Sequence, residues 1–592
     1  MNTTTNWRKT SQPLMPAEVT RKQLPPAGKY DMHPFAGLGA GRIHSGYASL
    51  AAWMAGYQTV LIDGYIGNNW ELIAARLEKE LLASGIAVNF VYTSTLMKSA
   101  DEVEVLVAPF LGEKGSVWGR RATITLDELF DENKLNNIQA PAAGMTIIIG
   151  TGAALTSLQA PLVYIDLPKN ELQYRMRART ANNLGKLEWD NNQETYKRFY
   201  FVDWVLLNAY KQRIMPRIDV IADGQWQHTI NWATQAAISE GLQQLSQNVF
   251  RVRPWFEAGA WGGDWMKEKI PGLNKDEVNY AWSFEMIVPE NGLVFESDGH
   301  LLEIAFDWLM MKHSKDVLGQ DEQRFGIDFP IRFDFLDTFN GGDLSIQCHP
   351  RLKYIREQFG ETITQDETYY ILDCKPGAKV YLGFQEDIDP AAFRHALEES
   401  VATDQPIAID KYVQVHDAHK HDFFLIPNCT VHSSGKNNLV LEVSATPYIF
   451  TFKMYDWVRL DLNGKPRPIN IDHAFHNLDF SRKGAKVKQE LISRQQVIEA
   501  GEDWQLVHVP THAEHFYDLH RMEFNSSVTV NTFGKCHVLM LVEGSSITVE
   551  TANGLRQRYN YAETFAIPAA AGAYRIINEG SGTAKVVKAF IK

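Results

Sequence analysis

The feature that most restricts the fold of this 592-residue chain is a change of pattern near residue 246. Before it, short apolar runs such as 58–63 (QTVLID) and 145–149 alternate with helix-like segments such as 70–84. This alternation predicts an α/β domain with a parallel sheet. After residue 246, many short strand-like runs follow one another with turns between them, which is typical of a β-barrel or a double-sheet jelly roll. We therefore expect a multidomain chain, α/β at first and all-β afterwards.

The length agrees with several domains, because one domain takes up roughly 150 residues. We expect a polar tail at residues 1–30, an α/β domain at 31–245, a β domain at 246–500 and a smaller β domain at 501–592. The last of these repeats the strand pattern, as in VLMLVEGSSITVET at 538–551. The chain thus predicts two β domains in succession.

Composition restricts the partners and the compartment. The chain has 71 acidic and 58 basic residues, a net charge of −13, and no long basic run, so a nucleic-acid surface is not expected. The sequence has no run of 18 apolar residues and no apolar N-terminal region, so neither a membrane span nor secretion is expected. The four cysteines include no CxxC pair, which favours a reducing cytoplasm over a disulfide framework.

A metal site is predicted around residues 344–382. Strand alternation through 345–349 places Gln347 and His349 on one face. Glu367 begins a second strand-like run, and His432 lies in a third. An amide oxygen, two imidazoles and a carboxylate form a plausible ligand set for zinc or a similar divalent ion.

The strand-loop-helix unit LIDGYIGNNWELIAARL at 61–77 occupies the place of a phosphate-binding loop. With its downstream strand PLVYIDLP, the region resembles the nucleoside and uridine kinase-like branch of P-loop proteins. Against the pattern GxxxxGK[ST], however, Asn69, Trp70 and Glu71 replace the second glycine, the lysine and the hydroxyl residue. An indole and a carboxylate cannot serve the phosphates and magnesium. We expect a degenerate P-loop kinase-like domain used for packing or ligand sensing, rather than an active kinase.

From Phe250 to Lys592 the chain resembles type I phosphomannose (mannose-6-phosphate) isomerases, which are zinc enzymes of the cupin fold. The matching segments, in order, are AWGGDW, YAWSFE, FPIRFDFLD, LSIQCHP, ETYYILDCKPGAKVYLG, FFLIPNCTVHSSG, LVLEVS and YDWVRLDLNGKPRP. The resemblance implies that both β domains are cupin (jelly-roll β-barrel) domains. The second carries PAAAGAY where the first carries PNCTVHS, so we expect it to be metal-free.

The resemblance also implies a reaction and a set of site residues. It implies that one Zn²⁺ in the first cupin domain is held by Gln347, His349, Glu367 and His432, with Arg459 of YDWVR and Glu442 of LVLEVS in the active site. The implied activity is the interconversion of mannose 6-phosphate and fructose 6-phosphate through a cis-enediol, a step of carbohydrate metabolism on a small sugar phosphate. Glu442 is the first candidate for proton transfer, although it could instead orient a ligand.

Two lysines usual in the family are missing, because Gln365 and Asp334 stand in their places. Three alternatives follow. Arg332, Arg459, Lys375 or another residue binds the phosphate; the enzyme acts on another or an unphosphorylated sugar; or the protein is a non-catalytic sugar-phosphate-binding or regulatory protein.

Overall fold

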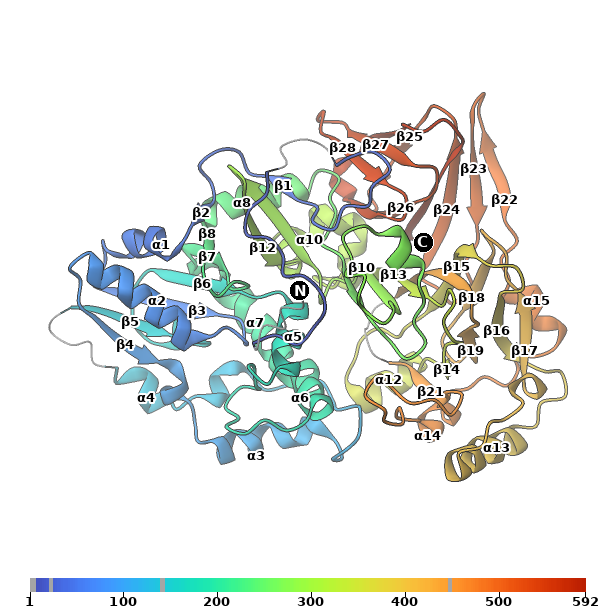
Figure 1. The fold of residues 1–592 in the computed structure, drawn as a ribbon, viewed down its shortest axis with the longest axis horizontal. Helices are drawn as coiled ribbons and strands as arrows, with labels where there is room; N and C mark the ends of the chain where they lie inside the picture. The colour runs from blue at the N-terminus through green and yellow to red at the C-terminus, as the bar shows by residue number, and fades with distance from the viewer. Residues whose placement is uncertain (1–6, 21–24, 139–143, 446–449) are drawn as a thin grey trace. The chain divides into compact units, whose positions relative to one another are not determined.

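The computed structural model describes residues 7–20, 25–138, 144–445 and 450–592, and Figure 1 shows its ribbon. The chain forms two compact units. Unit 1 consists of Met1–Lys22, Phe35–Gln244 and Gly292–Lys312, and unit 2 consists of Gln23–Pro34, Leu245–Asn291 and His313–Lys592. The predicted tail 1–30 falls in part outside the described residues. The sequence also predicts a strand at 449–455, of which residue 449 lies outside them.

Unit 1 contains a seven-stranded sheet in the order β2-β8-β7-β6-β3-β5-β4. Its strands are β2 (His44–Ser45), β3 (Thr59–Gly64), β4 (Val88–Tyr92), β5 (Met145–Ile149), β6 (Leu162–Asp166), β7 (Val220–Asp223) and β8 (Asn231–Thr234). Strands β3 to β7 are parallel, whereas β8 and β2 add antiparallel strands at one edge. Val60, Leu61 and Ile62 of the central strand are fully buried, as continuous apolar runs in parallel sheets are. The predicted parallel sheet is confirmed.

Helices connect these strands as the alternation predicts. They are α1 (Tyr47–Met54), α2 (Trp70–Ala83), α3 (Ala100–Leu111), α4 (Glu132–Asn136), α5 (Lys169–Arg177), α6 (Asn192–Arg198), α7 (Trp204–Ile214) and α8 (Gln235–Leu245). Helix α2 buries Ile73, Leu77 and Leu81, which recur every four residues and pack into the same core cluster as the sheet. Unit 1 also holds a small sheet of β1 (Ala36–Gly37), β11 (Gly292–Ser297) and β12 (His300–Ala305).

Unit 2 begins with two sheets that share one core. The six-stranded sheet has the order β18-β15-β20-β13-β10-β9, and the five-stranded sheet has the order β17-β16-β19-β14-β21. The first consists of β9 (Trp255–Glu257), β10 (Trp282–Met286), β13 (Ile331–Asp337), β15 (Glu367–Cys374), β18 (Phe423–Ile426) and β20 (Asn438–Ala445). The second consists of β14 (Ile346–Cys348), β16 (Lys379–Phe384), β17 (Val413–Asp417), β19 (His432–Ser434) and β21 (Phe452–Tyr455). Leu336 and Ile371 of the first sheet cluster with Val380 and Leu382 of the second, so the sheets pack face to face.

A second, smaller pair of sheets follows in unit 2. A six-stranded sheet, β22-β23-β24-β31-β26-β29, shares a core cluster with a four-stranded sheet, β25-β30-β27-β28. The strands are β22 (Gln496–Ala500), β23 (Trp504–Val509), β24 (Tyr517–Phe524), β25 (Ser527–Asn531), β26 (His537–Glu543), β27 (Ser546–Thr551), β28 (Arg556–Asn560), β29 (Thr564–Ile567), β30 (Ala573–Asn578) and β31 (Ala584–Ile591). Each sheet pair is a two-layered β structure, and pairing among the described residues closes neither into a barrel.

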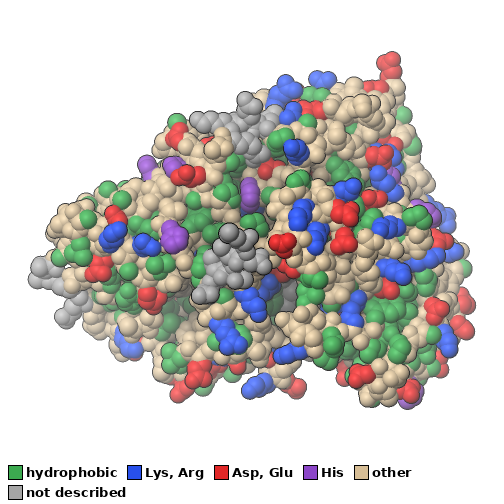
Figure 2. Space-filling model, viewed as in Figure 1, with side chains coloured by type: hydrophobic (Ala, Val, Ile, Leu, Met, Phe, Trp, Pro, Cys, Tyr) green, Lys and Arg blue, Asp and Glu red, His purple; other side chains and the backbone are tan. Residues whose placement is uncertain are grey.

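Short helices lie between the strands of unit 2. They are α9 (Trp265–Lys269), α11 (Glu322–Phe325), α12 (Leu352–Phe359), α13 (Pro390–Thr403), α14 (Ile471–Phe475) and α15 (Ala485–Glu490), while α10 (Asp307–Leu318) begins in unit 1 and is interrupted at His313. The sequence predicts one helix among these strands, at 390–401, and the structure confirms it as α13. Figure 2 shows acidic and basic side chains interspersed over the visible face, in agreement with the mixed charge of the sequence.

Candidate metal centre

Strand register brings four of the predicted site residues together. Gln347 on β14 lies directly opposite His432 on β19. Glu367 begins β15 in the other sheet, and His349 directly follows β14. Residues directly opposite one another in antiparallel strands project from the same face. The candidate centre therefore lies between the two packed sheets.

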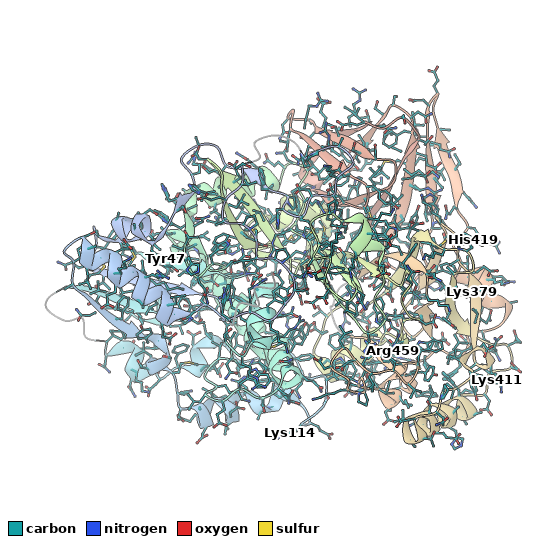
Figure 3. The ribbon with its side chains drawn as sticks, viewed as in Figure 1. Tyr47, Lys114, Lys379, Lys411, His419 and Arg459 are labelled. Carbon is teal, nitrogen blue, oxygen red and sulfur yellow. The ribbon has the colours of Figure 1, made fainter. Side chains whose placement is uncertain are left out.

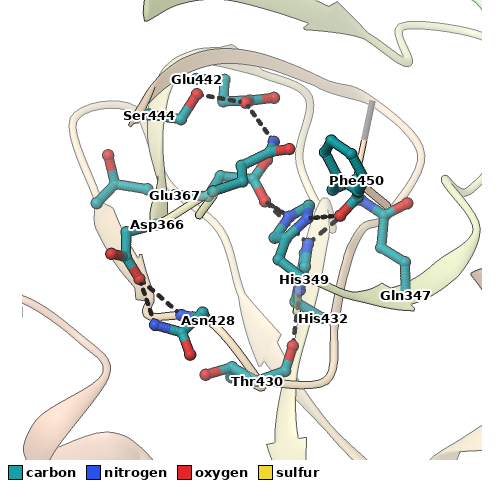
Figure 4. A network of polar contacts seen from close by, with 12 residues as sticks. Gln347, His349, Asp366, Glu367, Asn428, Thr430, His432, Glu442, Ser444 and Phe450 are labelled. Carbon is teal, nitrogen blue, oxygen red and sulfur yellow. Dashed lines mark hydrogen bonds and ion pairs between the residues drawn. The ribbon is translucent and has the colours of Figure 1, made fainter. Parts of the chain in front are cut away.

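His349, Glu367 and His432 form a buried cluster whose ligand-type atoms all lie within 4.8 Å of one another. Figure 4 shows the group. Oε2 of Glu367 lies 2.6 Å from Nε2 of His349 and 3.0 Å from Nε2 of His432. None of the three side chains is more than 1% exposed. Two ring nitrogens and a carboxylate oxygen thus converge on one point without access to bulk water.

The far side of each imidazole is held by a backbone carbonyl. Nδ1 of His349 lies 3.0 Å from the oxygen of Phe450, and Nδ1 of His432 lies 2.9 Å from the oxygen of Thr430. Because a carbonyl only accepts, each Nδ1 must donate, and each Nε2 faces Glu367. A neutral imidazole whose proton is on Nδ1 has a lone pair on Nε2. Two such lone pairs and a carboxylate repel one another unless a proton or a cation lies between them. This donor set fits a divalent ion, and the carbonyl partners are of the kind that orient metal-binding histidines.

The two histidines determine the charge of Glu367. Burial alone would raise the pKa of Glu367, but His432 and His349 outweigh it and hold the pKa well below its usual range. The carboxyl group therefore stays ionised, as a metal ligand must be.

Gln347 joins the cluster in an orientation that matters for ligation. Its Nε2 lies 3.2 Å from Nε2 of His432, while its Oε1 accepts a hydrogen bond of 3.0 Å from Ser345. The two ends of an amide have nearly the same shape, and their assignment follows from the surrounding hydrogen bonds. A half-turn of the amide would point Oε1 toward the ring nitrogens, which is the orientation a ligand needs.

Glu442 lies beside the cluster on β20. Its Oε1 accepts from Nη2 of Arg332 at 2.7 Å, from Oγ of Ser444 at 2.7 Å and from Nε2 of Gln365 at 3.2 Å. Burial raises the pKa of Glu442 well above its ordinary range, and the carboxylate of Asp334 adds to the rise against the opposing effect of Arg332. The three donors fix the orientation of this carboxyl group.

Arg332 is held by carboxylates. Its Nη2 donates to Oδ2 of Asp334 at 3.2 Å as well as to Glu442, and only 9% of its side chain is exposed. Lys375, the other alternative outside YDWVR, donates to Asn340. Arg332, one of the side chains that could bind a phosphate, is thus already paired with two carboxylates.

Arg459 lies in the turn after β21 and is labelled in Figure 3. Its Nη2 donates to Oδ1 of Asp456 at 2.6 Å. The intervening residues Trp457 and Val458 have φ of 57° and 53°, a left-handed conformation that is uncommon for any residue other than glycine and especially unusual for the β-branched Val458. The Trp457 indole donates to the oxygen of Leu344 at 2.7 Å, which ties this turn to the segment preceding β14.

Two further side chains near this turn were not predicted from the sequence. Arg467 donates to Oδ2 of Asp456 at 2.9 Å. Lys453 on β21 is half-buried, and burial together with the positive charge of Arg467 lowers the pKa of Lys453 to about 8. The sequence signal for Lys453 was a lysine between Phe452 and Met454 in an otherwise apolar strand.

Among the described residues, no helix is both long and apolar enough to cross a membrane.

Comparison with known proteins gives matches for both parts of the chain. A family model described as "Domain of unknown function (DUF8485)" matches residues 46–247. The chain is 26% identical over 227 residues to "Mannose-6-phosphate isomerase ManA" of Bacillus subtilis (strain 168), covering 38% of this chain and 67% of that protein. It is 21% identical over 326 residues to "Probable mannose-6-phosphate isomerase GmuF" of the same organism, covering 55% of this chain and 95% of that protein.

A solved structure with a related description is the crystal structure of mannose 6-phosphate isomerase from Bacillus subtilis. It matches at a TM-score of 0.48 and 19% identity, over 58% of this chain and 99% of that chain. The curated relatives of this chain are therefore mannose-6-phosphate isomerases by name, at low sequence identity.

Proposed function

We propose that the protein is a metal-dependent aldose-ketose isomerase that interconverts mannose 6-phosphate and fructose 6-phosphate. The observation that carries the proposal is the convergence of His349, Glu367 and His432 from segments 18 to 83 residues apart into one buried cluster. The names of the curated relatives support an isomerase acting on a sugar phosphate. We also propose the cytoplasm as its compartment.

The residues that would hold the ion are His349, Glu367 and His432, with Gln347 completing the set after its amide turns. We propose zinc, because two imidazoles and a carboxylate match its ligand preference. When bound, such an ion supplies a positive charge that polarises a sugar carbonyl.

The remaining chemistry is proposed for Glu442 and Arg459. Isomerisation requires a proton to move between two neighbouring carbons, and the buried carboxyl group of Glu442 is oriented by three donors for such a transfer. Arg459 presents a planar cation whose charge would bind an anionic part of the substrate.

A coupled assay tests the proposal. Purified zinc-loaded protein is given mannose 6-phosphate and, separately, free mannose. We expect turnover of mannose 6-phosphate, loss of that turnover in His349→Ala, and a lower zinc content in this variant. Binding of sugar phosphate without any turnover would contradict the isomerase and favour a non-catalytic binding protein.

For residues 31–245 we propose a P-loop-like domain without phosphotransfer. The parallel strands follow the order β4-β5-β3-β6-β7, so β4 and β5 are added on one side of β3 and β6 and β7 on the other. The loop after β3 is where such a sheet would bind a ligand. A Cβ on Gly64 would collide with the oxygen of Ile165, and one on Gly67 with the side chain of Leu172, so this loop packs tightly against the chain itself.

Backbone amides near this loop are used by an internal carboxylate. Asp63 accepts from the N–H groups of Gly64 at 2.7 Å, Gly152 at 2.9 Å and Ala154 at 2.8 Å. Such amides are the groups that cradle a phosphate in a P-loop. We expect no binding of ATP and no phosphorylation of mannose by the full chain.

We likewise propose the division of the β region into cupin domains at 246–500 and 501–592.

A further inference from the structure

The smaller sheet pair of unit 2 carries a row of polar side chains on the inner face of its six-stranded sheet. His520 on β24 lies opposite His508 on β23 and opposite Lys588 on β31. Residues paired in this way project from one face of a sheet. Two residues along the same strands, Met522 lies opposite Val586, and both belong to the core cluster between the two sheets. Because side chains two residues apart share a face, the polar row continues this core toward one end of the strands.

The other face of the same strands points toward the first sheet pair. The hydroxyl of Tyr517 donates to the oxygen of Val443 on β20 at 2.8 Å, and Nη1 of Arg521 donates to the hydroxyl of Tyr370 on β15 at 3.3 Å. Successive residues of a strand alternate between faces, so His520 projects away from these contacts. The polar row is therefore separated from the candidate metal centre by its own sheet.

The polar row becomes more buried from its edge inward. The side chain of His508 is 32% exposed, whereas Lys588 is 8% exposed. Next to the row, Nδ1 of the buried His537 on β26 lies 2.9 Å from the hydroxyl of Tyr574 on β30, which belongs to the four-stranded sheet. The four-stranded sheet thus covers the row on its inner side, and the row reaches water at His508.

Lys588 is a buried cation without a counter-ion in the described part of the chain. Its ammonium forms no hydrogen bond and no ion pair there, and its Nζ lies 4.9 Å from the centroid of the Phe590 ring. Burial lowers the pKa of Lys588 to about 8, and no acidic side chain of the described residues opposes the shift. A charge taken out of water without a partner costs free energy. An anion beside Nζ would remove that cost.

The neighbouring imidazole also has an unused polar atom. Nδ1 of His520 is buried and has no hydrogen-bond partner among the residues that the structure describes. Either nitrogen of a neutral imidazole can carry the proton, so this atom can donate to an acceptor. Because His520 and Lys588 are directly opposite, their Cβ atoms lie about 5 Å apart. The two donors can therefore reach one small oxygen-bearing group.

A carboxylate in the next cross-strand row is engaged elsewhere. Asp518 lies opposite Phe590, on the same face as Lys588. Its Oδ2 lies 2.9 Å from Nε2 of His508, and its Oδ1 accepts from the N–H groups of Thr511 at 3.1 Å and Leu519 at 3.0 Å. The charge of Lys588 is thus left for a ligand to neutralise.

We propose that the smaller sheet pair binds a small organic monocarboxylate, whose oxygens accept hydrogen bonds from Nζ of Lys588 and Nδ1 of His520. One negative charge matches the single ammonium, and charge-assisted hydrogen bonds to a carboxylate are among the strong ones in proteins. A phosphate dianion would leave a second charge unmatched in a buried place. Leu539 lies opposite Lys588, and Phe590 lies two residues along β31, so apolar surface is available for the carbon chain of the ligand. Binding at this site does not depend on the proposed isomerase reaction.

Calorimetric titration of the full chain with propionate tests the site. Propionamide is the matched ligand, because it has nearly the same shape without the charge. For a ligand of this size we expect a Kd for propionate of about 1 mM, and binding of propionamide and of orthophosphate at least about tenfold weaker. No binding of propionate up to about 50 mM would overturn the proposal, as would equal affinity for propionamide. Tighter binding of orthophosphate than of propionate would overturn the assignment to a carboxylate.

Two substitutions on one strand test the role of Lys588. Lys588→Met keeps the length of the side chain and removes its charge, so the affinity for propionate should fall at least about tenfold. Lys585→Met is the control, because Lys585 projects from the opposite face of β31, where its Nζ lies 3.3 Å from Oε2 of Glu543. This control should bind propionate as the unmodified protein does. Unchanged affinity in Lys588→Met would overturn the proposal.

A third variant and a stability measurement guard against misfolding. His520→Phe removes the second donor and should weaken propionate binding by about three- to tenfold. A ligand that binds only the folded protein raises Tm. Propionate should therefore raise the Tm of the unmodified protein and of Lys585→Met, and raise it less in Lys588→Met and His520→Phe. An equal rise of Tm in all four proteins would show that propionate binds elsewhere and would overturn the proposal.

Discussion

Single residues beside the candidate centre differ in how closely they bear on the proposed proton transfer. Glu442 and Asp334 lie side by side in cross-strand register, and both accept hydrogen bonds from Arg332. Glu442 also accepts from Gln365 and Ser444, whereas Asp334 is bonded to the guanidinium alone among the described contacts. The two carboxylates therefore offer a matched pair of substitutions that separates proton transfer from the positioning of Arg332.

We predict that Glu442→Gln lowers kcat for mannose 6-phosphate by about a hundredfold or more, because an amide cannot transfer the proton. Asp334→Asn should lower kcat much less, since it alters only the partner of Arg332. Zinc content and KM should stay near those of the unmodified protein in both variants. Equal losses of kcat in the two variants, with an unchanged pH profile, would instead assign Glu442 the role of holding Arg332.

At the scale of the elements, the turn after β21 combines backbone strain with a functional side chain. Val458 adopts a left-handed conformation at φ 53° and is 40% exposed, so little apolar packing stabilises it there. Such a conformation costs a non-glycine residue about 1–3 kcal/mol. A glycine at this position would relieve that strain, at an entropic cost of about 0.5–1 kcal/mol in the unfolded chain.

We predict that Val458→Gly raises the free energy of unfolding by about 1 kcal/mol, the difference between those two effects. Val415 of β17 is a matched control because it is 39% exposed in extended backbone. Val415→Gly should destabilise the protein by up to about 1 kcal/mol. Urea unfolding measures both. A loss of stability in Val458→Gly as large as that in Val415→Gly would show that the turn is not strained.

The same elements show what the sequence can and cannot predict about the site. Alternation within 345–349 placed Gln347 and His349 on one face, because the two-residue period of a strand is local. The contact between Arg332 and Glu442 could not be predicted in that way, since it depends on the pairing of strands whose residues are 110 positions apart. Lys453 was missed for a related reason. A register shift between Ile346 and Gln347 decides which residue of β21 faces Gln347.

On the scale of unit 2, a polar chain joins the two sheet pairs. Nδ1 of His421 lies 2.8 Å from the hydroxyl of Tyr370 on β15, and its Nε2 lies 2.6 Å from Oε2 of Glu543 on β26. The dense spacing of His416, His419 and His421 in the sequence favours exposed side chains, yet His421 is half-buried and His416 is buried. Local composition did not reveal this, because the partner Glu543 lies 122 residues further along the chain.

The pKa values of His421 and Glu543 are those expected when the His421 imidazole is neutral. Burial lowers the pKa of His421 to about 4, although the contact with Glu543 acts in the opposite direction. For Glu543, burial is outweighed by His421, Lys420 and Lys585, and its pKa falls to about 2. The two shifts are compatible when the uncharged ring donates its Nε2 proton to the carboxylate and accepts from Tyr370.

We therefore predict that acid weakens unit 2 through His421. The unfolded imidazole binds a proton near pH 6.5 and the folded one only near pH 4, so the stability it contributes is complete above pH 6.5 and is lost as the pH falls toward 4. The loss amounts to about 2 kcal/mol, after a reduction for partial exposure of the ring. His421→Gln keeps a donor toward Glu543 but cannot titrate. Its free energy of unfolding, measured by urea denaturation at each pH, should fall less than that of the unmodified protein between pH 6.5 and 4. Parallel curves would mean that His421 carries its proton in the folded protein, and the ring would then form a charged pair with Glu543 that persists to lower pH.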